Sequence, residues 1–591
     1  MNSRFPMQQL SAVALAAAVV FGASSLQAQS GGCPATRGGQ MPLKYVGGPT
    51  SPAISPCDLM TRLYIFADDS MNGRQVGTVD NLRGTAYIER EVRRLGLIPA
   101  GDSGGYFQNL PIFARSFDHS STITANGMTF HGGVDFTANI AEAHEAVQGN
   151  VIYGGMVGDT TNLLSADAVA GKIVVLRAPG GAPGGGARFG GGRRGAPSPA
   201  MQAYQQSLAG ALATVTVVGD SMPSAPQRGG FGGPRPTLRS DAPTVPRPAT
   251  ITVTTKVADA LLGKSIEGLT KGAAGGSVAM DLRFVEEAKP GRNVVAILRG
   301  SDPALRGEYV AIGAHNDHIQ NQRVVEHDSL KAYNMVARPE GADSRGAGAP
   351  TAEQWVMINH LKDSLRAIYP ARQDSISNGA DDDGSGSVSV LEIAEAFAKA
   401  SVKPKRSLIF VWHAGEEAGL WGSQYFTDHP TVPRDSIVAQ LNMDMVGRGA
   451  PSDVTGADKS GTILHGSSNY LQLVGSRRLS TELGDLMETV NKEQKLGFAF
   501  DYAMDADAHP QNIYCRSDHY EYARYGIPIV FATTGGHADY HQVTDEPQYI
   551  QYSHMAKVDQ LIFDVAVKVA NLDHRVVVDK PKPDPNGRCQ Q

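Results

Sequence analysis

Four short apolar runs in the second half of the chain are each followed by side chains that can bind a metal ion. The runs cover residues 309–314, 407–412, 438–443 and 529–532, and segments with a helical pattern lie at 388–400, 418–426 and 558–571. This alternation predicts an α/β fold, a mixed sheet with a mostly parallel core that is flanked by helices. In such sheets the active groups gather at the carboxyl ends of the strands.

The side chains at or near these strand ends are imidazoles and carboxylates: His315, Asp382, Glu416, Glu417, Asp444 and His541. Imidazole together with carboxylate, without thiolate, is the usual ligand set of a catalytic zinc site. Zinc lowers the pKa of bound water towards neutrality, so that hydroxide forms readily. Peptide hydrolysis needs hydroxide of this kind as its nucleophile. Any one of these residues alone is commonly a solvated loop residue, so their recurrence at equivalent ends of one sheet is what predicts a metal centre.

Five segments make the prediction more specific: GAHND, NGADDDGSG, AGEEAGLWGS, NMDM and YHQVTDE occur in this order. Together they resemble the signature blocks of the M28 family of zinc metallopeptidases, which holds aminopeptidases and related carboxypeptidases. MNGR at 71–74 and GDSGGYFQ at 101–108 resemble family blocks near the start of the domain. AGKIVVLR at 170–177 resembles part of the protease-associated domain that is often inserted in this family.

The resemblance implies two zinc ions per chain, and it assigns five residues as their ligands. Asp382, the middle acid of ADDDGSG, is expected to bridge both ions. His315 and Asp444 are expected to complete one site, and Glu417 and His541 the other.

The resemblance also implies roles for four further residues. Glu416 is expected to be the general base, which takes a proton from water and delivers it to the leaving amine. Asp317 is expected to orient His315, and Asp545 is a candidate to orient His541. For Tyr540 two roles stay open, support of the oxyanion by its hydroxyl and simple packing.

The length of 591 residues indicates more than one domain. We expect a signal peptide at 1–28, a lead-in and the first part of the peptidase domain at 29–136, and a protease-associated (PA) insert at 137–285. The peptidase domain proper is expected at 286–575 and a C-terminal tail at 576–591. Short β-branched runs at 151–153, 173–176, 213–218 and 249–254 indicate that the insert is rich in β-strands.

The first residues are typical of an export signal, because Arg4 precedes an apolar stretch at 10–21 and Ala28 offers a cleavage site. A membrane anchor is the alternative, but the stretch is short for a bilayer span. We therefore expect a secreted or periplasmic protein with no membrane contact after cleavage. Its four cysteines allow three connectivities, of which we favour Cys33–Cys57 with Cys515–Cys589.

The stretch between His315 and Asp382 is unusually long for the family. The extra segment, about 318–377, contains a predicted amphipathic helix at 352–368. It either walls the substrate cleft or decorates the outside, and its residues 326–328 are expected to be solvated.

The predicted function is a secreted di-zinc exopeptidase that acts on peptides, with an aminopeptidase preferred. The alternatives are a carboxypeptidase or dipeptidase of the same family, a glutaminyl cyclase and an inactive binding homologue. An aminopeptidase needs an acidic group for the substrate ammonium, for which Asp518 is a candidate, whereas a carboxypeptidase needs a cation such as Arg516 or Arg448. The net charge of -6 gives no support for a nucleic-acid partner.

The segment GDSGG at 101–105 resembles the nucleophile block of trypsin-like serine proteases. Those enzymes place the catalytic histidine before the serine, whereas the first histidine of this chain, His119, follows Ser103. We therefore expect a tight turn at Ser103.

Overall fold

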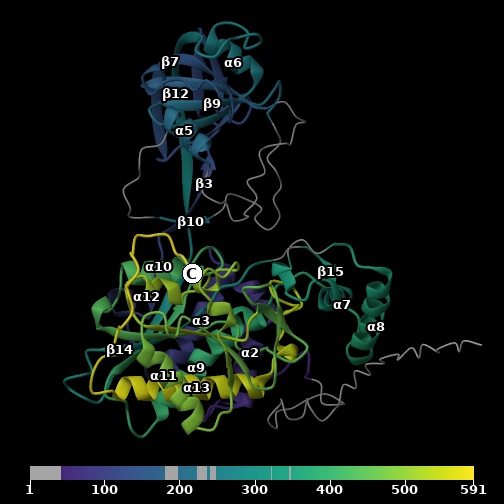
Figure 1. The fold of residues 1–591 in the computed structure, drawn as a ribbon, viewed down its shortest axis with the longest axis vertical. Helices are drawn as coiled ribbons and strands as arrows, with labels where there is room; N and C mark the ends of the chain where they lie inside the picture. Colours follow the sequence, from purple (N-terminus) through teal and green to yellow (C-terminus); the bar gives the residue numbers. More distant parts are fainter. Residues whose placement is uncertain (1–40, 180–197, 223–235, 240–247, 321–322, 345–347) are drawn as a thin grey trace, which may run out of the picture. The chain divides into compact units, whose positions relative to one another are not determined.

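A computed structural model describes residues 41–179, 198–222, 236–239, 248–320, 323–344 and 348–591 (Figure 1). The predicted signal peptide, Cys33 and the glycine-rich residues 180–197 lie outside the described residues. The chain forms two compact units, one of residues 110–291 and one that combines the segments before and after it. The expected insert, 137–285, lies inside the first of these, which begins 27 residues earlier than expected.

The unit that holds the predicted metal-binding residues is built on a nine-stranded sheet in the order β1-β13-β17-β14-β18-β23-β21-β22, with β2 beside β13. Strands β17, β14, β18 and β23 are parallel to one another, whereas β13 and β21 run antiparallel to their neighbours β17 and β23. This is the predicted mixed sheet with a parallel core. The strands are β1 (Ile98–Pro99), β2 (Phe107–Asn109), β13 (Arg292–Leu298), β14 (Tyr309–His315), β17 (Ser407–His413), β18 (Ile437–Met443), β21 (Tyr470–Val474), β22 (Ala499–Asp501) and β23 (Ile529–Thr533); a separate hairpin pairs β19 (Val454–Ala457) with β20 (Ile463–His465).

Helices cover both faces of this sheet. Along β14, Val310 and Ile312 belong to one hydrophobic cluster and Ala311 to another, because successive strand residues point to opposite faces. The first cluster takes in α2 (Pro56–Phe66), α3 (Val79–Arg94), α9 (Gly386–Lys399), α11 (Thr481–Glu493) and α13 (Tyr552–Asn571), and the second α10 (Trp421–Asp428) and α12 (His519–Ala523).

The strand positions were predicted more accurately than the helix starts. Helix α13 begins six residues before the predicted 558, and α10 begins at Trp421 instead of 418. Helix α3 begins at Val79 because the Thr78 side chain caps it by accepting the N–H of Asp80, and it ends before Gly96, whose φ is +74°. Ser103 lies in a tight turn, as expected, at residues 102–104.

The second unit is a β-rich body with a ten-stranded sheet in the order β10-β3-β12-β7-β8-β9-β11-β6, joined by β4 and β5. Ile173, Val215 and Ile251 from three neighbouring parallel strands are fully buried in its core. Its elements are β3 (Ile112–Phe117), β4 (Thr122–Ala125), β5 (Met128–His131), β6 (Phe136–Asn139), β7 (His144–Met156), α4 (Ala166–Val169), β8 (Lys172–Arg177), α5 (Pro199–Leu208), β9 (Ala213–Val217), β10 (Pro236–Leu238), β11 (Ala249–Val253), α6 (Thr255–Leu262) and β12 (Ala274–Lys289).

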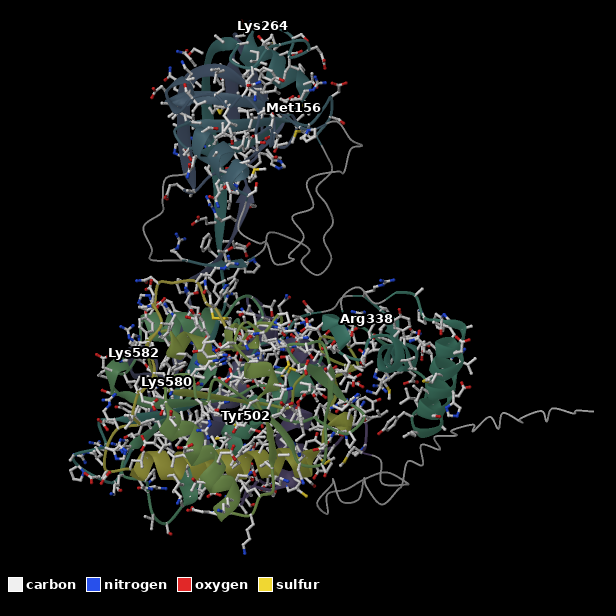
Figure 2. All side chains as sticks on the ribbon, viewed as in Figure 1. Met156, Lys264, Arg338, Tyr502, Lys580 and Lys582 are labelled. Atoms are coloured by element: carbon white, nitrogen blue, oxygen red, sulfur yellow. A yellow bond between two sulfur atoms is a disulfide. The ribbon has the colours of Figure 1, made fainter. Side chains whose placement is uncertain are left out.

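The extra segment between His315 and Asp382 folds into β15 (Val325–Glu326), α7 (His327–Ala337), the short turn η4 (Gly341–Asp343), α8 (Ala352–Ile368) and β16 (Gln373–Asp374). Helix α8 has the predicted bounds and begins with a capping box between Thr351 and Gln354. Arg338, labelled in Figure 2, follows the last turn of α7 and leads the chain towards η4.

The expectation that residues 326–328 are solvated is wrong for two of them. His327 and Asp328 are fully buried. The reason is tertiary, since the His327 ring stacks on Tyr549 and its Nε2 lies 2.8 Å from the Glu546 carboxylate. These contacts join the start of α7 to the body of the unit.

One of the two favoured cysteine pairs is present, a disulfide between Cys515 and Cys589 (Figure 2). The other pair includes Cys33 and stays a prediction. Among the described residues, each helix falls short of the length or the apolar character that crossing a bilayer requires.

Candidate metal centre

The strand order brings the predicted ligands to one edge of the sheet. His315 is the last residue of β14, Glu416 and Glu417 follow β17, and Asp444 follows β18. Because these three strands are parallel neighbours, their carboxyl ends meet.

The two remaining predicted ligands come from loops at the same edge. Asp382 lies in the turn η5 (Ala380–Ser385) that leads into α9, and His541 follows β23. The backbone of His541 is in the left-handed region, with φ +58°.

The first cluster forms around His315. Its Nε2 lies 3.2 Å from Oδ1 of Asp382 and 3.6 Å from Oδ1 of Asp444. Ser517 donates a hydrogen bond of 2.6 Å to the other oxygen of Asp444, so this carboxylate has a fixed orientation.

The second cluster forms around His541. Its Nε2 lies 3.0 Å from Oδ2 of Asp382 and 3.0 Å from Oε2 of Glu417. Asp382 therefore turns one carboxylate oxygen towards each cluster, which is the position expected of a bridging ligand.

His318 also belongs to the second cluster and was missed from the sequence. Its Nδ1 lies 2.8 Å from Oε1 of Glu417 and 3.6 Å from Oδ2 of Asp382. The donor atoms of His318, Asp382, Glu417 and His541 all lie within 4.8 Å of one another. His318 was expected to begin the extra segment, although its place three residues after His315 was a usable signal for a metal ligand.

Asp383 lies beside His315 and Asp444, but its carboxylate is hydrogen-bonded to the backbone. Its carboxylate accepts N–H groups of His315, Gly386 and Met445 at 3.0, 2.8 and 3.2 Å. Its oxygens thus hold together the three loops that carry the first cluster.

The charges in the centre favour an ionised bridging carboxylate. Burial opposes ionisation of Asp382, but the neighbouring imidazoles of His318, His315 and His541 hold its pKa well below the usual range. Burial raises the pKa of Glu416 well above its ordinary value, and the negative charges of Asp444 and Glu417 add to this effect.

The two predicted orienting residues, Asp317 and Asp545, also contact backbone groups of the surrounding loops. Nδ1 of His315 is 3.1 Å from the backbone oxygen of Asp317 and 3.7 Å from its carboxylate, which accepts the N–H groups of Gly415 and Glu416. Asp545 accepts the N–H groups of residues 381 and 382 and so fixes the loop that carries Asp382.

Tyr540 lies at the cleft with its ring stacked on His541, at 4.0 Å between ring centres. Its hydroxyl accepts a hydrogen bond of 3.2 Å from Arg516. The hydroxyl is thus held next to the second cluster.

The donor set fits zinc. Several buried ring nitrogens and carboxylate oxygens face one another at short distances without the geometry of a hydrogen bond among the described residues: His315 Nε2, His318 Nδ1, Asp382 Oδ2 and Glu417 Oε1. Buried polar atoms are rarely left without partners, so their convergence indicates a bound cation. Imidazole and carboxylate donors around an open cleft suit catalytic zinc.

A cleft with an empty volume of about 690 Å³ adjoins the centre and includes Asp382, Glu416, Asp444, Tyr540 and His541 in its lining. Its apolar lining consists of Met445, Met504, Ile513 and Phe531.

The three residues that the sequence offered for binding the charged terminus of a substrate have different surroundings in the structure. Arg516 lines the cleft. Arg448 is buried and paired with Asp539 and Asp453, and Asp518 is buried with its carboxylate 3.4 Å from His413.

Comparisons with known proteins found similar peptidases. Residues 293–566 match the model of peptidase family M28. The chain is 27% identical over 269 residues to leucine aminopeptidase 1 of Aspergillus fumigatus, a match of 42% of this chain and 63% of that protein. It is 42% identical over 81 residues to leupeptin-inactivating enzyme 1 of Streptomyces exfoliatus, which is 13% of this chain and 18% of that enzyme.

The chain thus covers well under two thirds of the Streptomyces enzyme and likewise only 33% of a probable leucine aminopeptidase of Arthroderma benhamiae. Among solved structures, an aminopeptidase from Aneurinibacillus sp. strain AM-1 aligns with 90% of this chain and 97% of its own, at 16% identity and a TM-score of 0.42. The match to the model of peptidase family M28 thus covers residues 293–566, the part of the chain that contains the strand ends and loops described above.

Proposed function

We propose that this protein is an exported aminopeptidase that uses two zinc ions to remove N-terminal residues from peptides. The position of Asp382 carries the proposal, because its two oxygens point to separate clusters of imidazole and carboxylate. His315 and Asp444 would hold one ion and Glu417 and His541 the other, with His318 as a further donor on the second.

Zinc ions held here would polarise the scissile carbonyl and lower the pKa of water. Glu416 takes the proton from the attacking water and passes it to the amide nitrogen as the C–N bond breaks. Its raised pKa and its place in the cleft lining suit this role. The Tyr540 hydroxyl, which Arg516 holds in place, would donate to the oxygen that gains negative charge.

The cleft supports an apolar residue at the substrate's N-terminus. Met445, Met504, Ile513 and Phe531 line it, and the relatives from Aspergillus and Arthroderma are named leucine aminopeptidases. A carboxypeptidase would need a free cation for the terminal carboxylate. Arg516 is the arginine in the cleft lining, and it is already paired with Asp343 at 2.8 Å.

The disulfide between Cys515 and Cys589 supports export, because such bonds persist in oxidising compartments. We also propose that the β-rich unit, residues 110–291, acts as the PA insert and controls which peptides are cleaved. It takes no part in the chemistry.

The test uses the purified full chain with peptides whose N-terminus is either free or acetylated. We expect release of the first residue from the free peptides alone, loss of turnover after chelation, and recovery when zinc is restored. Release of C-terminal residues from acetylated peptides would instead identify a carboxypeptidase. Cyclisation of N-terminal glutamine without release of amino acids would identify a cyclase.

A further inference from the structure

The extra segment supplies acidic side chains to the cleft. Glu340 and Asp343, from the stretch that follows α7, are in the cleft lining together with Glu416, Asp444 and His541. This part of the segment therefore forms one wall of the site, whereas α8 of the same segment is largely exposed.

This wall is fixed against the loop that carries His541. Lys331 of α7 is buried with its ammonium 2.6 Å from the carboxylate of Asp539, and the N–H of Ala342 donates to the backbone oxygen of Tyr540 at 3.1 Å. Gly341 has φ +56°, and a Cβ there would lie 2.5 Å from that same oxygen. The side chains on either side of Gly341 are thus held at a defined place beside the centre.

The two acids of this wall have different partners. Asp343 neutralises Arg516 with a contact of 2.8 Å. Glu340 receives a hydrogen bond of 3.3 Å from the neutral amide of Gln511. Within the part of the chain that the structure describes, no lysine, arginine or histidine lies within 4 Å of the Glu340 carboxylate.

The negative charge of Glu340 is therefore not balanced by a positive group among the described residues of the cleft. The carboxylates of Asp382, Glu417 and Asp444 face the candidate metal positions, and Asp343 is matched by Arg516. A half-buried carboxylate that has only a neutral partner favours a cation from the ligand.

We infer that Glu340 binds a cationic group of the substrate, and this inference rests on the proposed aminopeptidase activity. Two groups have the required chemistry, the α-ammonium of the N-terminal residue and the side chain of an N-terminal lysine or arginine. The apolar lining around Met504 and Ile513 suits a hydrophobic side chain, which favours the α-ammonium as the partner of Glu340.

The test compares Glu340→Gln with the unaltered full chain in the presence of zinc, on leucine and lysine p-nitroanilides. Loss of one charged contact should raise KM about tenfold or more while kcat changes little, because only substrate binding is affected. An equal rise on both substrates assigns the α-ammonium, and a rise on the lysine substrate alone assigns the side chain. An unchanged KM on both substrates would overturn the inference.

The control variant is Glu353→Gln, which removes an exposed glutamate from α8 of the same segment. It should leave kcat and KM as they are. A second variant, Asp343→Asn, removes the negative charge that is paired with Arg516 in the cleft and should also raise KM for both cationic substrates. An unchanged KM in this variant would count against an electrostatic role of this wall. If the unaltered chain with zinc hydrolyses neither anilide, the proposed function itself fails, which is a different result from an active enzyme that tolerates Glu340→Gln.

Discussion

At the scale of single residues, the centre depends on carboxylates whose surroundings give them different tasks. Asp382 is kept ionised by three imidazoles and faces both clusters, whereas Glu416 has a raised pKa and lies in the cleft lining. Asp383 binds backbone N–H groups with both oxygens. Neighbours in the sequence, Asp382 with Asp383 and Glu416 with Glu417, thus differ in role because adjacent side chains point in different directions.

Replacing Glu416 by Gln should abolish most turnover and leave the metal content unchanged. The amide keeps the size of the side chain but cannot accept the proton from water, so kcat should fall by roughly 10²- to 10⁴-fold. Stopped assays with a leucine anilide and metal analysis of the same sample provide the measurement. Turnover close to that of the unaltered protein would refute the role of Glu416 as the base.

Replacing Asp382 by Ala should release both metal ions together, because this carboxylate faces both clusters. Zinc analysis after dialysis should show a drop from about two ions per chain to none. Loss of a single ion would contradict a bridge.

The comparison variant is His318→Asn, which removes a donor from the second cluster alone. It should weaken one site and spare the other, so that titration of the metal-free protein with zinc separates into a tight and a weak step. This readout does not depend on activity.

At the scale of the elements, function depends on loops that follow regular strands. The four parallel strands were predictable because each is a largely apolar run that is buried on both faces, although β18 also contains Gln440 and Asn442. Helix starts were less accurate, since α13 begins with a turn that the apolar pattern did not mark. The loops themselves are stabilised by buried polar contacts, such as those of Asp545 with the backbone of residues 381 and 382.

Helix α12 brings an acid-sensitive histidine into the core. His519 is fully buried with its ring stacked on Phe531, and burial lowers its pKa to about 3 from 6.5. The unfolded chain therefore binds more protons than the folded chain between these two values, and stability is lost as the pH falls through that window. We expect the free energy of unfolding to drop by about 2 kcal/mol between pH 6.5 and pH 5 from this residue.

Urea unfolding of the chelator-treated protein at several pH values measures this effect. In His519→Asn the slope of stability against pH should be smaller, whatever the absolute stability. Replacement of the exposed His465 by Asn should leave the slope as it is. An identical slope in His519→Asn and the unaltered chain would show that this histidine is not the cause.

At the scale of the whole molecule, the chain interrupts one compact unit with another. The β-rich unit leaves after Asn109 of β2 and the chain returns at Arg292 of β13. These two residues are direct partners in the antiparallel pair of β2 and β13. The peptidase unit is therefore closed at this point without the residues in between.

Because β2 and β13 are paired where the chain leaves and returns, residues 110–291 can be removed and replaced by a short turn. Replacing residues 110–291 by the turn Asn-Gly would convert β2 and β13 into a hairpin with a two-residue loop. We expect the shortened protein to hydrolyse a leucine anilide with kcat/KM within about threefold of the full chain and to differ by more than about tenfold on longer peptides. A folded, zinc-loaded variant that hydrolyses all these substrates like the full chain would exclude a role of this unit in substrate choice.

The sequence by itself determined the four parallel strands and the residues that follow them, because these are local features. The five predicted ligands came from the resemblance to a family, and the structure gathers their side chains at one edge of the sheet. The sequence did not determine which side chains meet across the fold. The place of His318 in the second cluster, the pairing of Arg516 with Asp343 and the burial of Arg448 and His327 were decided by the tertiary structure alone. Each of these contacts joins segments far apart in the chain, and their energies depend on burial and partner charge, which no local pattern contains.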